Sequence, residues 1–218
     1  MEDFENDWQE ELHFRIDDDY KSTDFFDVEE NYRDYFSDKL LNTVRLSVMC
    51  KSDIIAYLEL YLFFDEKIKE TGSNPVAVAD DSLSDDSYEA MRILEKQGFF
   101  NRDESSNLFY LLSSRPISTV YIRRIAVRED YRGKGIGGWL LQNLRDVMEI
   151  NFAVIPGVAI VKVYPEKITW HGGVPTFGTD EMADTDFTEM VGILEKLFES
   201  KGFVRYEDTP FFIRDYAK

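Results

Sequence analysis

The sequence predicts an α/β (α+β) protein in which strands and helices mix, and three observations support this prediction. Runs of alternating apolar residues, as strands show, occur at 43–50 and 54–64. Apolar residues recur at helical spacing over 139–150 and 186–201. A nearly continuous apolar run at 158–164 is typical of an interior strand.

The N-terminal part is predicted to form a strand, a helical region and a hairpin. Residues 12–16 alternate as a strand does, and the helical spacing of apolar residues over 22–41 predicts one helix or two short ones. Three polar residues separate the runs at 43–50 and 54–64, which predicts that these strands form an antiparallel hairpin.

Residues 65–116 depart from this order. They are rich in Ser, Asp, Pro and Gly and contain a predicted helix at 87–97 that Gly98 ends. We therefore expect a single domain of residues 1–218 with an insertion at about 65–116. Composition does not choose among a lid, a contact that would give a homodimer, and a surface loop for this insertion.

The C-terminal part begins with a predicted strand at 121–127, followed by a glycine-rich turn and a helix. A Pro-Gly pair precedes the strand at 158–164, and a loop is expected at 165–185. The helix at 186–201 ends at a glycine, and residues 203–216 are predicted to form a final strand or hairpin.

Charge and composition exclude several classes of protein. The formal net charge is -18, and residues 1–40 alone hold fifteen acidic and four basic side chains, which disfavours nucleic-acid binding and favours cationic partners. The single cysteine, Cys50, excludes an internal disulfide framework and is compatible with a reducing cytosol. Neither a signal sequence nor a membrane-length apolar run is present. We expect a cytoplasmic protein without a membrane or metal site.

The turn RGKGIGG at 132–138 is typical of phosphate-binding sites, and three kinds of phosphate-binding motif could account for it. The nucleoside-triphosphate loop requires GxxxxGK followed by Ser or Thr, and that string is absent. Gly133, Gly135 and Gly138 satisfy the dinucleotide pattern GxGxxG. However, several predicted strands precede it, and no acidic residue ends the next strand, so the context disfavours a dinucleotide site.

The third kind takes residues 122–144, IRRIAVREDYRGKGIGGWLLQNL, as a whole. This string resembles the acetyl-coenzyme A motif of the GNAT superfamily of N-acetyltransferases. The resemblance implies a mixed, mostly antiparallel sheet of six to seven strands flanked by helices, with a splayed strand pair that holds acetyl-CoA. The residues that match the cofactor-binding motif are Ile125, Ala126, Val127, Arg132, Gly133, Lys134, Gly135, Ile136, Gly137 and Gly138.

Physical chemistry supports this resemblance independently. Glycines remove side chains from the tip of a helix, where free backbone N–H groups and the helix dipole favour a diphosphate. Basic residues gather near this turn in an otherwise acidic chain, at positions 123, 124, 128, 132 and 134. A purely structural glycine turn would account for the glycines but not for these basic residues.

The resemblance also implies how acetyl transfer would proceed. The backbone of Ile125 and Val127 would hold the pantetheine arm, and a backbone N–H near Val127 would stabilise the oxyanion that forms when an amine attacks the thioester. Phe198 stands where the family often has a tyrosine that protonates the thiolate. Tyr164 is the expected substitute, ahead of His171. The alternatives are that Tyr164 is a simple aromatic residue at a strand end and that the thiolate leaves without a proton donor.

Glu59 is the candidate general base. It is the one carboxylate within the apolar strand at 54–64, and it shares a face with Tyr57 and Tyr61. Aromatic surroundings tend to raise the pKa of a carboxyl group, which suits proton abstraction near neutral pH. A partly exposed glutamate on an open sheet face and an ordered water acting as base are the alternatives.

Three functions remain open from the sequence. The first is an N-acetyltransferase whose acceptor is a small-molecule amine or a basic peptide, cationic and attracted by the acidic N-terminal segment. The second is a coenzyme A-binding protein with little or no turnover, which Phe198 favours. The third is an interaction protein whose acidic face captures a basic partner.

Overall fold

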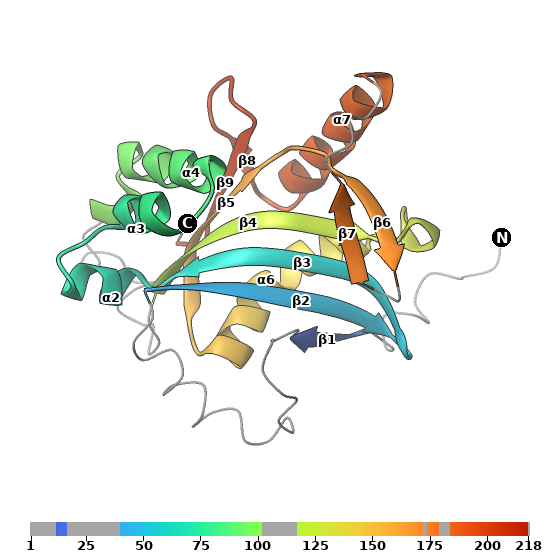
Figure 1. Cartoon of the computed structure of the whole chain (residues 1–218), viewed down its shortest axis with the longest axis horizontal. Coiled ribbons are helices and arrows are strands. Elements are labelled where there is room, and N and C mark those ends of the chain that lie inside the picture. The colour runs from blue at the N-terminus through green and yellow to red at the C-terminus, as the bar shows by residue number, and fades with distance from the viewer. Residues whose placement is uncertain (1–11, 17–39, 102–116, 172–173, 179–183, 218) are drawn as a thin grey trace.

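The computed structural model describes residues 12–16, 40–101, 117–171, 174–178 and 184–217 of the 218-residue chain (Figure 1). The helical region expected at 22–41 lies almost entirely outside these residues, as does most of the acidic N-terminal segment.

A seven-stranded sheet organises the described part of the chain, in the order β1-β2-β3-β4-β5-β9-β8. Its neighbours pair antiparallel except for β4 and β5, which are parallel. This sheet confirms the mixed, mostly antiparallel architecture. The strands are β1 (Leu12–Ile16), β2 (Leu41–Cys50), β3 (Asp53–Phe63), β4 (Ile117–Val127), β5 (Ile155–Lys162), β8 (Val204–Arg205) and β9 (Phe211–Asp215).

The predicted hairpin is present, with β2 and β3 paired from Leu41 opposite Phe63 to Cys50 opposite Asp53. Every residue of β3 after Asp53 is buried, although the sequence alternates only in part. The reason is that both faces of the central sheet are covered, so that apolar residues are accommodated on each side.

One face of the sheet packs against α6 (Ile136–Phe152) and the other against helices of residues 65–96 (Figure 1). Leu140, Leu144 and Met148 of α6 join Leu46 and Leu60 in the first core. A second helix, α7 (Asp184–Ser200), contacts α6 and contributes Phe198 to the same core. The glycine-rich turn at the start of α6 is thereby fixed against the sheet.

The segment expected to be an insertion folds into α2 (Asp65–Glu70), α3 (Pro75–Ser82) and α4 (Asp85–Lys96), followed by the short 3-10 helix η2 (Phe99–Asn101). The predicted helix at 87–97 corresponds to α4, whose residues Met91 and Leu94 are fully buried. In α3, the Asn74 side chain caps the helix by accepting from the Ala77 N–H at 2.9 Å. That the segment is an insertion in one domain stays a prediction.

The expected loop at 165–185 is wrong in part, because β6 (Lys167–His171) and β7 (Val174–Gly178) form a separate antiparallel hairpin. Each strand has only five residues. The hairpin packs over the sheet through the rings of Phe177 and Tyr57, whose centroids lie 5.9 Å apart. No helix in the described part of the chain is both long and apolar enough to cross a bilayer.

Candidate functional site

A gap between two neighbouring strands marks the candidate site. β4 and β5 pair in parallel only from Ile117 opposite Ile155 to Ile122 opposite Val161. On its other edge, β4 continues to pair with β3 as far as Val127. Among the described strands, residues 123–127 therefore have a partner on one side only, which confirms the predicted splayed strand pair.

A cleft lies at this gap. It is bounded by β4, by the end of β5 and the residues after it, by the β6–β7 hairpin and by α7. Its lining is Ile122, Arg123, Arg124, Ile125, Val161, Lys162, Val163, Tyr164, Pro165, Glu166, Ile168, Phe177, Met190, Leu194 and Phe198. The cleft combines an apolar wall with charged side chains, as expected of a site that binds a small organic molecule.

The exposed glycine turn leads directly into the N-terminal tip of α6, whose first three residues are buried. Gly133 and Gly135 have φ angles of +73° and +80°, a left-handed conformation that favours glycine. Trp139 donates from its backbone N–H to the carbonyl oxygen of Gly135 at 2.9 Å. The backbone N–H groups of residues 136–138 precede that bond and have no acceptor within the helix, which makes the tip suited to an anion.

Gly137 and Gly138 lie close to the C-terminal end of α7. Both are buried, and a Cβ atom on Gly138 would lie 2.7 Å from Lys201 Cε, while one on Gly137 would lie 3.3 Å from Leu197 Cδ2. A side chain at Gly137 would crowd α7, whereas the nearest neighbour of Gly138 is the flexible end of Lys201, just after that helix. That both glycines help to bind the cofactor stays a prediction, and their N–H groups lie at the helix tip.

The five basic residues near the turn do not form one cluster. Arg128 makes two hydrogen bonds to Asp130, at 2.8 and 2.9 Å, which raise the pKa of the arginine and lower the pKa of the carboxyl group. Arg132 and Lys134 are exposed at the turn, where Arg132 Nε donates to the carbonyl oxygen of Val127 at 3.1 Å. These two residues provide the positive charge at the helix tip.

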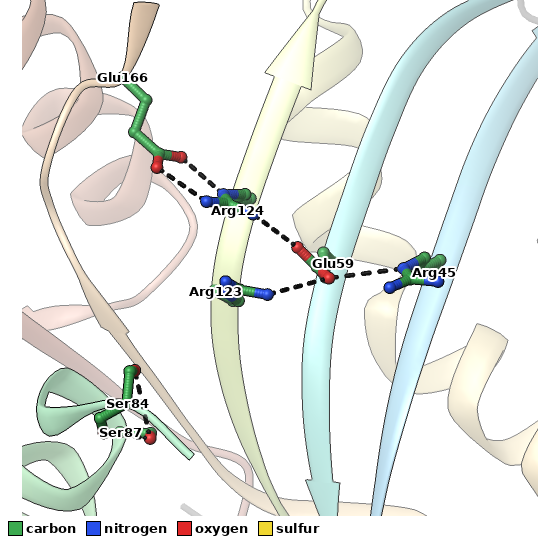
Figure 2. A network of polar contacts seen from close by, with 7 residues as sticks. All are labelled: Arg45, Glu59, Ser84, Ser87, Arg123, Arg124 and Glu166. Atoms are coloured by element: carbon green, nitrogen blue, oxygen red, sulfur yellow. Dashed lines mark hydrogen bonds and ion pairs between the residues drawn. The ribbon is translucent and has the colours of Figure 1, made fainter. Parts of the chain in front are cut away.

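Arg123 and Arg124 instead converge on Glu59. In the β3–β4 ladder, Glu59 lies opposite Arg124 and Leu60 lies opposite Ile122, so Arg123 is the extra residue of a β-bulge. Consecutive strand residues normally point to opposite faces, but here both guanidinium groups reach one carboxylate, at 3.2 and 3.3 Å (Figure 2). Arg45 of β2 also contacts Glu59, at 3.5 Å.

Arg124 connects the sheet to the hairpin. Its Nε and Nη2 donate to the two carboxylate oxygens of Glu166 at 2.8 and 3.1 Å, and its guanidinium lies 4.4 Å from the centre of the Phe177 ring. Burial disfavours the charged form of Arg124, but the hydrogen bonds to Glu166 and the attraction of both carboxylates outweigh it and raise the pKa. Arg124 is therefore a cationic clamp on the wall of the cleft.

Comparison with known protein families shows which family the chain belongs to. The model of the acetyltransferase (GNAT) family matches residues 2–152. The chain belongs to this family. The match confirms the predicted family and the class of enzyme, an acyltransferase that uses acetyl-CoA. No curated protein matches the sequence.

Solved structures similar to this acetyltransferase have low sequence identity. Arabidopsis thaliana NAA60 in complex with acetyl-CoA is 13% identical over 95% of this chain and 99% of its own, with a TM-score of 0.44. A mutant AtaT toxin bound to the C-terminus of the antitoxin AtaR and acetyl-CoA is 13% identical over 94% and 93%, with a TM-score of 0.39. AAC(6')-Ib with paromomycin and acetyl-CoA is 12% identical over 84% and 69%, with a TM-score of 0.34.

The residues predicted for catalysis in this acetyltransferase lie in different surroundings. Tyr164 follows β5, lines the cleft, is 61% exposed and packs edge-on against Phe187 of α7, with ring centroids 5.4 Å apart. Glu59 is 3% exposed and is not among the residues that line the cleft. His171 lies exposed at the end of β6 and does not line the cleft either.

Phe198 is part of the core of the acetyltransferase. It is 1% exposed and packs against Phe203 at a ring-centroid distance of 5.3 Å, as its place on the apolar stripe of the helix predicts. Sequence reasoning missed the contribution of Glu166 and Phe177 to the site. The available signal was the pair Gly172 and Gly173 between two short alternating runs, which is typical of a hairpin.

Proposed function

We propose that this acetyltransferase moves the acetyl group of acetyl-CoA to a primary amine by direct attack within a ternary complex. The observation that supports this most is the continuity between the helix tip and the cleft. A Cβ atom on Gly137 would lie 3.7 Å from Val127 Cγ2 and 3.9 Å from Ile125 Cδ1, so the tip of α6 packs against the open end of β4.

The two ends of the acetyl donor would have separate sites along β4. The diphosphate would bind the N–H groups at the tip of α6, with Gly133 and Gly135 shaping the turn and Arg132 and Lys134 adding positive charge. The backbone of Ile125 and Val127, on the edge that β5 leaves open, would hydrogen-bond the pantetheine arm and guide it into the cleft.

Acetyl-CoA would supply a thioester that a neutral amine attacks, so that an amide bond forms and the carbon–sulfur bond breaks. A backbone N–H in the open part of β4, near Val127, would donate to the thioester oxygen as negative charge develops there. Tyr164 would donate its hydroxyl proton to the departing sulfur. Holding the reactants in place would provide most of the acceleration.

For Glu59, the surroundings support a positioning role rather than direct proton abstraction. Both carboxylate oxygens accept from guanidinium groups, and the side chain is not among those that line the cleft. We propose that Glu59 holds Arg123 and Arg124 in place and that water carries the proton away from the amine.

Acetyl-CoA binding and thiol release test this function. Gly135→Ala should weaken acetyl-CoA binding at least about tenfold, because a side chain at a left-handed position displaces the N–H groups of the tip. Gly72→Ala is the matched control. Gly72 has a φ of +73° and lies after α2, outside the cleft, so alanine there causes the same backbone strain but leaves the proposed diphosphate site unchanged. Calorimetry measures both affinities.

Thiol release is measured across polyamines, aminoglycosides, amino acids and basic peptides. Release that depends on an amine supports transfer. Equal affinity in the two glycine variants would contradict the placement of the diphosphate.

Binding without turnover is the second candidate, because buried Phe198 stands where the family often has a proton-donating tyrosine. It predicts that acetyl-CoA binds wild-type protein and that no amine releases thiol. Tyr164 at the cleft favours the enzyme over this alternative.

A further inference from the structure

We propose that the acceptor amine carries a nearby anionic group, a carboxylate or a phosphate, which Arg123 binds. This inference rests on the proposed acetyl transfer and names the class of acceptor. It reverses the sign of the acceptor that the overall charge of -18 favours.

The charges that line the cleft differ from those of the whole chain. Three lining side chains are cationic, Arg123, Arg124 and Lys162, and Glu166 is the one anionic residue of the lining. A local field, not the net charge of the protein, decides which ligand a cleft attracts. On the cleft wall itself cationic side chains outnumber anionic ones, and the other carboxylates that pair with them, Glu59 and Asp86, lie outside the lining.

Two of these three cations are occupied by protein carboxylates. Arg124 uses three of its nitrogens for Glu166 and Glu59. Lys162 Nζ donates to Asp86 of α4 at 2.6 Å. Both residues therefore serve mainly to connect surrounding elements to the sheet.

Arg123 is used less completely. Its one hydrogen bond among the described residues runs from Nη1 to Glu59 Oε1 at 3.2 Å, which is longer than the ~2.7–2.9 Å of strong charge-assisted bonds. That oxygen also contacts Arg45. A guanidinium has five N–H donors, so the Arg123 side chain, which is 34% exposed, retains donors for a bidentate anion.

The position of Arg123 fits an acceptor site. It is the bulge residue of β4 and the first residue of the open part of that strand, where the thioester is proposed to lie. Its guanidinium also lies 5.6 Å from the centre of the Tyr61 ring, a cation–π contact that helps to hold the side chain in place. An anion held here would bring an amine a few atoms away toward the thioester.

Matched acceptor pairs test the inference by thiol release. Glycine is compared with glycinamide, and phosphoethanolamine with ethanolamine, while spermidine represents a cationic acceptor. At least one anionic member should show kcat/KM at least about tenfold above its neutral partner. Glycinamide has the less basic amine, so a preference for glycine cannot come from a larger fraction of neutral amine. The pair that discriminates identifies the anion as carboxylate or phosphate.

Variants assign the preference to a residue. Arg123→Gln should reduce it to about twofold or less, and Arg123→Lys, which keeps the charge but not the fork, should retain part of it. Arg45→Gln is the matched control, because Arg45 contacts the same carboxylate but does not line the cleft. It should keep the full preference. Thermal denaturation verifies that each variant is folded.

The outcomes separate the two proposals. Transfer to neutral amines or to spermidine with no preference for either anionic member overturns the inference and leaves the acetyltransferase activity intact. Loss of the preference in Arg45→Gln as well as in Arg123→Gln also overturns it, because the effect would then come from Glu59. Acetyl-CoA binding without thiol release by any amine overturns the proposed transfer, and the inference with it.

Discussion

Glu59 illustrates how one residue organises several others. Its carboxylate, buried in β3, contacts guanidinium groups from the strands on both sides. Removing the negative charge from such a position leaves partly buried guanidinium groups with one ion pair fewer, which is costly even where the intact pair contributes little.

We expect Glu59→Gln to lower the free energy of unfolding by about 1–3 kcal/mol, because an amide cannot compensate the charges of Arg123 and Arg124. Glu195→Gln is the control, since Glu195 pairs with the more exposed Arg205 and should change stability by less than about 1 kcal/mol. Denaturant unfolding measures both. Equal stabilities of the two variants would show that the network around Glu59 contributes no more than a surface pair.

The same Glu59 variant distinguishes a positioning role from a base. A positioning role predicts that kcat falls modestly and that the pH profile keeps its shape. A general base predicts a loss of roughly a hundredfold or more in kcat and removal of the acidic limb of the profile. The second result would restore the role that the sequence first indicated.

Tyr164 is tested by removing one oxygen atom. Tyr164→Phe should lower kcat by about tenfold to a hundredfold, with KM for acetyl-CoA nearly unchanged, because only proton donation to the thiolate is lost. The effect is expected at the low end of acid catalysis, because a thiol of pKa ~8.5 is already a good leaving group. An unchanged kcat would make Tyr164 a simple aromatic residue packed on Phe187.

At the scale of elements, the β6–β7 hairpin depends on the clamp formed by Arg124 and Glu166. Glu166 immediately precedes β6, and Phe177 of β7 stacks on the same guanidinium. Two five-residue strands are marginally stable alone, so the hairpin depends on these contacts with the sheet.

We expect Glu166→Gln to increase amide hydrogen exchange within residues 167–171 by roughly tenfold, while exchange in α6 stays unchanged. The reason is that loss of the bidentate ion pair frees the start of the hairpin. Exchange at residue resolution by mass spectrometry or NMR measures the change. Unchanged exchange in β6 would show that aromatic packing alone holds the hairpin.

Whether an element can be predicted depends on how local its sequence signal is. The strands of the first hairpin, the interior strand at 158–164 and the long helices all show the apolar period that their packing requires. α2 and α3 escaped prediction because six and eight residues hold too few turns to show an apolar stripe. The β6–β7 hairpin escaped prediction as well, because each of its strands has only five residues.

At the scale of the whole molecule, alkaline pH should destabilise the fold through buried tyrosines. Burial raises the pKa of Tyr121 well above its usual range, with Asp86 adding to the shift, and burial also raises the pKa of Tyr216. Below pH ~10 the hydroxyls are protonated in both states, and their contribution to stability is complete. Above it, only the unfolded state loses these protons, so stability falls as pH rises.

Tyr121→Phe should therefore flatten the loss of stability between about pH 10 and 11.5 by up to ~1.4 kcal/mol per pH unit. The ring and its packing in the core between the sheet and the helices of residues 65–96 remain, so stability near pH 8 should change much less. Denaturant unfolding at a series of pH values measures both slopes. Parallel curves for variant and wild type would show that Tyr121 ionises equally in the two states.

The sequence by itself determined the family, the longer strands and helices, and the glycine-rich turn at the start of α6 that is proposed to bind the diphosphate. These properties depend on short-range patterns, namely apolar periods and a glycine-rich turn whose conformation few other residues adopt. Strand 121–127, the turn and the following helix therefore predicted the cofactor side of the site.

Only the tertiary structure revealed the arrangement on which the proposed acceptor site rests. One extra residue in the β3–β4 ladder turns Arg123 and Arg124 toward the same carboxylate, and the sequence does not reveal where a ladder gains a residue. The tertiary structure also packs Gly137 and Gly138 against Leu197 and Lys201, and it places Glu59 in an ion-pair network. Side-chain direction and burial depend on which segments pair and pack, and distant parts of the chain provide those neighbours.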